Sequence, residues 1–201
     1  TRYGSPVHEG FRPGRDASCI ATLRLGGGVL LGKTVTTEFA HRHPGKTHNP
    51  HHPEHTPGGS SSGSAAAVGS SMVGAAFGSQ TTGSVIRPAA YCGAVGYKPT
   101  YGEINGSGML ANTPSFDTVG MITRYVDDLV VLRAALLGDE LSPVTPPNIS
   151  DLTIGYCRTP YWDQADAEAR AMTDRAVNVL ANAGARIEEF DGGGAFDGLD
   201  D

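Results

Sequence analysis

The chain has 201 residues, of which 39% are hydrophobic, so it is long enough to bury a core. Its formal net charge is −6, which argues against nucleic-acid binding, because that needs clustered Lys and Arg. No apolar run approaches the length of a membrane span. Three widely spaced cysteines, Cys19, Cys92 and Cys157, argue against a disulfide framework and favour a reducing, cytoplasmic compartment.

The first part of the chain predicts helices and strands around one long loop. Asp16 is expected to cap the first helix and Gly26 to end it. The long loop holds four prolines and six of the seven histidines. In chain order, we expect a helix over 17–25, a short buried strand at 29–31, a helical turn at 36–40, an ordered loop over 41–57, a helix of small residues over 62–73 and a strand at 75–78.

The rest of the chain continues the alternation. Asp127 and Asp128 lie in the first turn of an amphipathic helix, where the helix dipole favours acidic side chains. We expect helices over 84–91, 125–137 and 165–183, and strands at 94–97, 152–157 and 185–190. Helices alternating with short apolar strands predict an α/β fold, with a mixed central sheet covered by helices on both faces.

The most informative stretch is residues 58–87, which is rich in Ser, Gly and Ala and almost free of charge until Arg87. Such composition is typical of flexible linkers, but the apolar residues spread through it argue against a linker. Small side chains let the backbone pack closely and leave N–H groups free to face a ligand. Ser60 and Ser84 lie 24 positions apart on either side of an Ala-rich helical stretch. This layout suits a hydroxyl nucleophile with a second hydroxyl as proton carrier.

A nucleotide-binding loop is one competing interpretation, because residues 27–34, GGVLLGKT, match the pattern GxxxxGK[ST]. That mechanism needs a strand before the first glycine and a solvated loop across the variable positions. Here the variable positions include Val29, Leu30 and Leu31, which are expected to form the strand, and the preceding ATLRL is expected to be helical. We therefore expect no phosphate-binding loop.

A metal site is a second competing interpretation, since His41, His43, His48, His51, His52 and His55 lie close together in the sequence. Zinc needs three or four ligands in a defined geometry. Only Glu54 joins the histidines, and a proline-rich loop does not preorganise ligands well. We expect a solvated or hydrogen-bonded loop, and neither a metal nor a cofactor.

A Ser–His–Asp hydrolase is a third competing interpretation. The segment around Ser84, TTGSVI, lacks the second glycine of the G-x-S-x-G turn. All histidines except His8 cluster in the loop before that serine. Paired serines are the better basis for a hypothesis.

The segments GGSSSGSAAAV (58–68) and GSVIRPAAYCGAVGYKPT (83–100) resemble the signature of the amidase signature family, the Ser–Ser–Lys amide hydrolases. The chain departs from the family pattern at Ser62, which stands in place of a glycine, and at residues 78–84, GSQTTGS, where G-T-D-x-G-G-S is common. The resemblance implies that residues 1–201 are part of a single amidase-signature-like domain that is incomplete at both ends. Its core signature would span about 26–137, followed by a strand–helix–strand segment at 150–201. We expect the chain to be an internal fragment.

The resemblance also implies site roles. Ser84 would be the nucleophile, and Ser60, after a cis Gly59–Ser60 peptide bond, would relay its proton to a lysine. The N–H groups of Thr81, Thr82, Gly83 and Ser84 would form the oxyanion hole. The family's catalytic lysine lies in a GxPxxxKD stretch that does not occur here.

Other positions match the family without an expected part in the chemistry. Lys33 matches a structural lysine of the family at a strand–loop junction. Arg87, Lys98 and Asp117 are expected to pin loops by hydrogen bonds, and Gln80 to keep the hydrogen bonds of the usual acid without its charge.

The implied reaction is hydrolysis of a small-molecule carboxamide to a carboxylic acid and ammonia through an acyl-serine intermediate. Alternatives are a glutaminase-type subunit of a transamidosome, or a non-catalytic fragment that lacks the lysine. We expect the fragment alone to be inactive and the full-length protein to be a possible homodimer.

Overall fold

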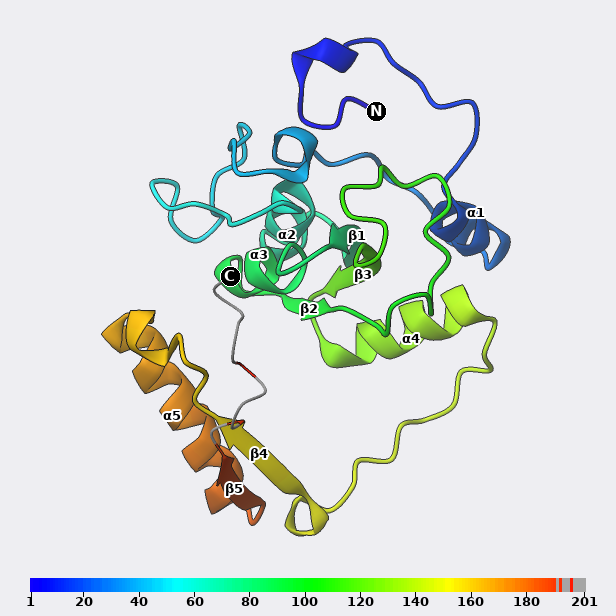
Figure 1. Ribbon diagram of the computed structural model, residues 1–201. Coiled ribbons are helices and arrows are strands. Elements are labelled where there is room, and N and C mark those ends of the chain that lie inside the picture. The colour runs from blue at the N-terminus through cyan, green and yellow to red at the C-terminus, as the bar shows by residue number, and fades with distance from the viewer. Residues whose placement is uncertain (191, 193–195, 197–201) are drawn as a thin grey trace. The chain divides into compact units, whose positions relative to one another are not determined.

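The computed structural model describes residues 1–190, 192 and 196. The chain divides into two compact units, residues 1–142 and 143–201, which are described separately (Figure 1). The prediction that both belong to one domain stays a prediction.

The first unit contains most of the helices and a three-stranded sheet. Its elements in chain order are η1 (Pro6–His8), α1 (Ser18–Leu25), η2 (Glu38–Ala40), α2 (Ser62–Gly69), β1 (Ala75–Gln80), α3 (Ile86–Tyr91), β2 (Val95–Tyr97), β3 (Thr118–Thr123) and α4 (Val126–Leu137). The sheet order is β1-β3-β2, and both pairings are antiparallel.

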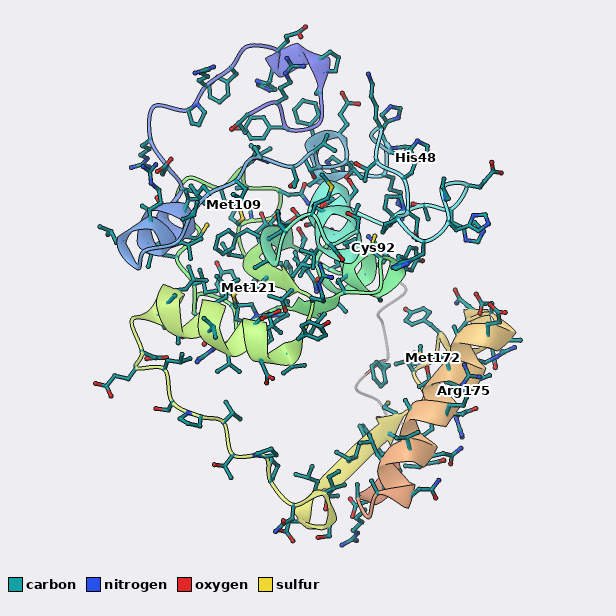
Figure 2. All side chains as sticks on the ribbon, turned by 180° about the vertical axis from the view of Figure 1, so that it is seen from behind. His48, Cys92, Met109, Met121, Met172 and Arg175 are labelled. Atoms are coloured by element: carbon teal, nitrogen blue, oxygen red, sulfur yellow. The ribbon has the colours of Figure 1, made fainter. Side chains whose placement is uncertain are left out.

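Strand β3 is the centre of this sheet, and all six of its residues are buried. Side chains alternate across a strand, so each face of β3 meets a different set of helices. Val119 and Met121 join a core with residues of α1 and α4. Ile122 joins a second core with residues of α2 and α3 (Figures 1 and 2). The α/β class, with helices on both faces of a sheet, is therefore confirmed.

Residues 29–31 form no strand, so that prediction is wrong. Val29 and Leu31 are 81% and 75% exposed. A strand needs a partner for its backbone groups, and no backbone hydrogen bond within the described residues reaches these three. The apolar side chains of residues 29–31 favour a strand, but they do not provide a second strand to pair with it.

Two helix ends also differ from expectation. Asp16 does not cap α1: the N-cap is Ala17, without a side-chain bond, and Asp16 forms an ion pair with Arg24 at 3.1 Å. Helix α2 ends at Gly69 and not at residue 73, because Ser71 adopts a left-handed conformation (φ 67°) that turns the chain toward β1.

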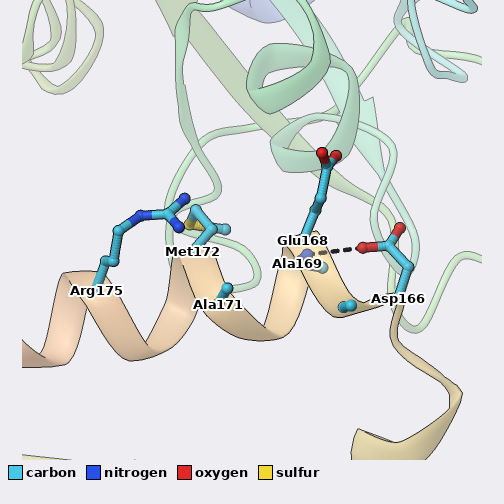
Figure 3. Close-up of a pocket in the computed structure, with 7 residues that line it drawn as sticks. Asp166, Glu168, Ala169, Ala171, Met172 and Arg175 are labelled. Atoms are coloured by element: carbon cyan, nitrogen blue, oxygen red, sulfur yellow. Dashed lines mark hydrogen bonds between the residues drawn. The ribbon is translucent and has the colours of Figure 1, made fainter.

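The second unit is a strand–helix–strand segment, as predicted. It contains η3 (Ile149–Asp151), β4 (Thr153–Cys157), η4 (Trp162–Gln164), α5 (Ala167–Asn182) and β5 (Arg186–Phe190). Strands β4 and β5 pair in parallel. Asp166 caps α5, its carboxylate accepting a hydrogen bond from the Ala169 N–H at 2.7 Å (Figure 3). No helix of the described residues, in either unit, is long and apolar enough to cross a membrane.

Candidate active site

Ser60 lies at the entrance to α2, directly after a cis peptide bond between Gly59 and Ser60, as predicted. The residue is buried, with 3% of its surface exposed. Its carbonyl accepts two hydrogen bonds, from the Thr36 hydroxyl at 2.8 Å and the Thr37 N–H at 3.0 Å. These bonds fix the main chain on which the Ser60 hydroxyl is carried.

Residues 34–37 form hydrogen bonds with the start of α2 and the residues just before it. The Thr34 hydroxyl lies 2.7 Å from the Ser64 hydroxyl, which in turn donates to the Phe77 carbonyl in β1 at 2.7 Å. The Gly63 N–H donates to the Val35 carbonyl at 3.0 Å. A Cβ on Gly63 would lie 2.6 Å from that carbonyl oxygen, so the close approach requires glycine there. Thr34, the last residue of the GKT segment, thus has a structural part at this site.

Ser84 lies on the other side of the same site, in the turn between β1 and α3. Its carbonyl accepts a hydrogen bond from the Ser61 N–H at 3.2 Å. Arg87, in the first turn of α3, donates from Nε and Nη2 to the Gly59 carbonyl at 3.2 and 3.0 Å. The two serine-containing segments therefore lie against each other. Direct contact between the Ser60 and Ser84 hydroxyls stays a prediction.

Two facing glycines make room for this arrangement. Gly78 and Gly120 are partners in the β1–β3 register. A Cβ on Gly78 would lie 2.5 Å from the Ser61 hydroxyl oxygen, and one on Gly120 would lie 2.8 Å from a methyl of Val85. Val85, the residue after the proposed nucleophile, is fully buried in this space. The glycine pair thus lets the turn that carries Ser84 pack directly on the sheet.

The backbone N–H groups of Thr81, Thr82, Gly83 and Ser84 donate no hydrogen bond to any acceptor in the part of the chain that the structure describes. Thr82 is exposed and the other three are half-buried. A turn with free, partly shielded donors is what stabilisation of an oxyanion requires. Whether these donors serve a reaction stays a proposal.

Thr81 is fixed by a second loop. Its hydroxyl donates to the Asp117 carboxylate at 2.5 Å and accepts from the Asn112 side chain at 3.3 Å. The other oxygen of Asp117 accepts from the N–H groups of Asn112 and Thr113 at 2.6 and 2.8 Å. Asp117 and Arg87 therefore pin loops as predicted, whereas Lys98 donates to the carbonyl of its own neighbour, Pro99, at 2.6 Å, so its expected part in pinning a loop stays a prediction.

Lys33 is an exposed residue whose Nζ donates to the neighbouring Thr34 carbonyl at 3.0 Å. Although the residue as a whole is exposed, desolvation by the surrounding protein lowers the pKa of its ammonium group. It has no hydrogen bond to either serine in the described residues. Helix α1, and not a strand, precedes the GxxxxGK[ST] match among the described residues, as expected, but the variable positions form an exposed loop and not the strand on which its rejection also rested.

The histidine-rich segment is a hydrogen-bonded loop, as predicted. Asn49 donates to the Tyr91 carbonyl at 2.9 Å, and a ring nitrogen of His51 lies 2.9 Å from the Cys92 carbonyl. A ring nitrogen of His48 lies 2.8 Å from the Pro53 carbonyl (Figure 2). The loop therefore caps the carboxyl end of α3. Within the described ranges no three His, Cys, Asp or Glu side chains gather as ligands would.

A hollow beside α5 in the second unit is lined only by residues of that helix and its cap, among them Asp166, Met172 and Arg175 (Figure 3). It contains none of the residues that the sequence singled out. The proposed chemistry belongs to the first unit.

Sequence reasoning missed part of the site's support. Thr36, Asn112 and the Gly78–Gly120 pair were not singled out, although each shapes a serine-bearing segment. The run TVGMIT at residues 118–123, with its β-branched residues and central glycine, was the available signal for β3.

Comparison with known proteins gives a consistent result. The sequence model of the Amidase family matches residues 1–193. The A subunit of the glutamyl-tRNA(Gln) amidotransferase of Salinibacter ruber is 38% identical over 205 residues, and that of Lachnospira eligens is 36% identical over 210. These matches cover 92% and 95% of this chain but only 40% and 44% of the relatives, so the chain spans less than half of their length.

Solved structures agree. The peptide amidase from Stenotrophomonas maltophilia matches 98% of this chain with a TM-score of 0.82 and 31% identity. The A subunit of the glutamyl-tRNA(Gln) amidotransferase from Thermotoga maritima matches 95% of it, also with a TM-score of 0.82 and 31% identity. In both cases the match covers 46% of the solved chain.

Proposed function

The chain belongs to the amidase family, and we propose that its protein hydrolyses a carboxamide to a carboxylic acid and ammonia through an acyl-Ser84 intermediate. The observation that carries this proposal is the packing of the two serine segments. The Ser61 N–H donates to the Ser84 carbonyl, and Arg87 donates to the carbonyl of Gly59. A nucleophile and its proton carrier must lie close together, because transfer of a proton between them needs direct contact or one bridging water.

We assign the roles from the family resemblance, and the packing of the two serine segments supports them. The Ser84 hydroxyl attacks the amide carbonyl, and its proton passes through the Ser60 hydroxyl to a neutral lysine. We place that lysine outside residues 1–201, because the GxPxxxKD stretch of the family does not occur in them and Lys33 donates to the carbonyl of its own neighbour. The free N–H groups of residues 81–84 receive the developing oxyanion. When the tetrahedral intermediate collapses, the C–N bond breaks and the proton held by the lysine passes back through Ser60 to the nitrogen, which leaves as ammonia. Water then hydrolyses the acyl-serine ester to the carboxylic acid and regenerates the Ser84 hydroxyl.

Ammonia release tests this proposal. The whole protein, extended to include the upstream lysine segment, should release ammonia from members of a panel of simple linear amides. A fluorophosphonate probe, which reacts with activated serines, should label Ser84. A protein that folds, leaves every amide intact and takes up no probe would refute the proposal and favour a non-catalytic role.

A glutaminase-type subunit is the second candidate, and the names of the relatives favour it. The proteins of Salinibacter ruber and Lachnospira eligens are both named as the A subunit of a glutamyl-tRNA(Gln) amidotransferase. The SVIRP variant at residues 84–88 and the Ser79–Gln80 pair favour a general amidase instead. Ammonia release from glutamine that requires partner proteins would support the glutaminase; release from simple amides by the protein alone would support the amidase.

Compartment and assembly are part of the same proposal. Cys19, Cys92 and Cys157 are all free thiols, which supports a reducing, cytoplasmic compartment. A homodimer of the full-length protein stays a prediction, and sedimentation of that protein would test it.

A further inference from the structure

Gln80 ends strand β1 immediately before the turn that carries Ser84. Only 4% of its surface is exposed, so its side-chain amide needs partners inside the protein. It finds all of them in the following turn. Its Oε1 accepts from the N–H groups of Val85 and Ile86 at 2.9 and 3.0 Å, and its Nε2 donates to the Thr82 carbonyl at 3.1 Å.

These three bonds act as a helix cap. The first N–H groups of a helix have no partner within the helix, and α3 receives no side-chain bond from its own N-cap residue, Val85. Gln80 accepts from the N–H groups at 85 and 86 and leaves those of 81–84 free. It therefore divides the donors of this segment into a bound set and a free set.

The donor end of the amide matters as much as the acceptor end. A carboxylate at this position could accept both N–H bonds but could not donate to the Thr82 carbonyl. Its charge would also face that carbonyl oxygen at the distance of a hydrogen bond. Asn carries the same amide on a side chain shorter by one methylene. The observed bonds thus use both ends of a glutamine amide.

We propose that Gln80 is the positioning residue of the oxyanion turn: its amide clamps the Thr82 carbonyl to the first N–H groups of α3, and so aims the free N–H groups of residues 81–84 at one point. This inference rests on the proposed amide hydrolysis. Gln80 itself touches neither substrate nor the reacting atoms.

Charged groups near the turn are few. Asp117 binds the hydroxyl of Thr81 on one side, and Arg87 lies one residue beyond Ile86 in α3 and binds the Gly59 carbonyl. Burial and the carboxylate of Asp117 would raise the pKa of a carboxyl group introduced at position 80, whereas the N–H groups of Val85 and Ile86 and the charge of Arg87 would lower it. A protonated carboxyl has one donor and one acceptor, like the amide, so pH can restore the lost donor.

Two variants of the whole protein test the clamp. Gln80→Met removes both ends of the amide, and kcat/KM should fall about 10- to 100-fold at every pH. Gln80→Glu should show a similar loss at pH 8, and its ratio to the wild type should recover only once the pH falls below the pKa of the introduced carboxyl group. The matched controls are Gln164→Met and Gln164→Glu at an exposed glutamine of η4, which should stay within about twofold of the wild type.

Hydrogen exchange of a peptide over residues 81–91 gives a second readout that does not depend on activity. Gln80→Met should speed exchange of the Val85 and Ile86 amides at least about tenfold while the core strand β3 stays protected. Unchanged exchange there would overturn the clamp, whether or not the protein is an amidase. A kcat/KM within about twofold of the wild type in Gln80→Met would also overturn it, leaving Gln80 a packing residue. A protein without amidase activity but with faster exchange would refute only the proposed function.

Discussion

Arg87 donates two hydrogen bonds to the main-chain carbonyl of Gly59, from Nε at 3.2 Å and from Nη2 at 3.0 Å. One guanidinium thus joins the helix that follows Ser84 to the segment that carries Ser60. Arginine suits this position, because two nitrogens of its planar group can share one acceptor. Helix α3 and the loop before α2 are held in register by a side chain that is itself exposed.

Replacing Arg87 should therefore weaken catalysis more than folding. Arg87→Met removes both bonds, and a displacement of Ser60 relative to Ser84 by about 1 Å is enough to cost on the order of 100-fold in kcat. Hydrogen bonds to a charged group contribute about 1.5–3 kcal/mol when shielded, and less at an exposed site such as this one. The melting temperature should consequently fall by only a few degrees. Steady-state kinetics and thermal unfolding of the whole protein measure both quantities.

The control for this variant is Arg42→Met, at an exposed arginine of the histidine-rich loop. It should leave kcat and the melting temperature unchanged. Full activity in Arg87→Met would show that α3 and the loop before α2 keep their relative position without the Arg87 hydrogen bonds.

The serine pair makes a second prediction. Ser84→Ala should abolish acyl transfer, because no nucleophile remains. Ser60→Ala should lower kcat by several orders of magnitude with KM almost unchanged, since the proton path is used only in the transition state. Ser70→Ala, at an exposed serine after α2, is the matched control and should behave as the wild type. Equal, mild losses in Ser84→Ala and Ser60→Ala would point to binding roles instead.

The glycine pair makes a third prediction. Gly78→Ala would bring a methyl group within 2.5 Å of the Ser61 hydroxyl oxygen and 3.0 Å of a Val85 methyl. Relief requires Ser61 or Val85 to move, and overpacking of this kind costs about 1–3 kcal/mol. For a chain of this size the melting temperature should fall by roughly 2–12 °C. Gly74→Ala is the control, since an added Cβ there meets nothing within 4 Å. Similar melting of the Gly78→Ala and Gly74→Ala proteins would mean that the space around Val85 is not tight.

Local sequence pattern was enough to predict most helices and strands of the fold. The strand predicted at residues 75–78, the helix α5 and the strands around it have local causes: short apolar runs, a helix-compatible stretch and a glycine that ends it. The central strand β3 was missed although the run TVGMIT carries β-branched residues, because its pairing with β1 and β2 and its burial under helices on both faces are not local. Residues 29–31 show the converse. Their sequence is that of a strand, but a strand exists only where another strand pairs with it.

The candidate site likewise has features that the sequence predicts and contacts that it does not. The serine spacing and the small residues around it are visible in the sequence, and the resemblance to the amidase signature family gave their expected roles. The contacts that support them are not local: Thr36 reaches across 24 positions to the Ser60 carbonyl, and Asn112 across 31 positions to Thr81. No single-sequence pattern encodes such pairs, because each partner is an ordinary loop residue until the fold brings them together.

Thiol reactivity makes a fourth prediction. Burial raises the pKa of the Cys92 and Cys19 thiols, and thiolates are the reactive form. Cys92 is fully buried, with its thiol against the Pro57 carbonyl at 3.4 Å, as expected for a packing residue. Cys157 is only half-buried. Iodoacetamide at pH 7.5 should therefore modify Cys157 at least about tenfold faster than the other two in the folded protein. In urea all three should react alike; preferential labelling of Cys92 in the folded state would contradict the packing role.

Lys33 makes the last prediction, which separates it from the catalytic base. Its Nζ is bound to the Thr34 carbonyl, so Lys33→Met in the whole protein should keep kcat within a few-fold of the wild type. Its pKa is lowered in the fold by desolvation. At pH values between that lowered pKa and the ordinary lysine pKa of about 10.4, the unfolded chain binds more protons than the folded one. Lys33 therefore makes the free energy of unfolding rise with pH in this range. Lys33→Met should lose that rise while keeping the rest of the pH–stability curve, which urea unfolding from pH 7 to 10.5 would measure. Lys46→Met, at an exposed lysine of the histidine-rich loop, should leave the curve unaltered. If residues 1–201 alone hydrolysed an amide robustly and Lys33→Met abolished that activity, Lys33 would be the base, and the proton path from Ser84 through Ser60 would end within this chain.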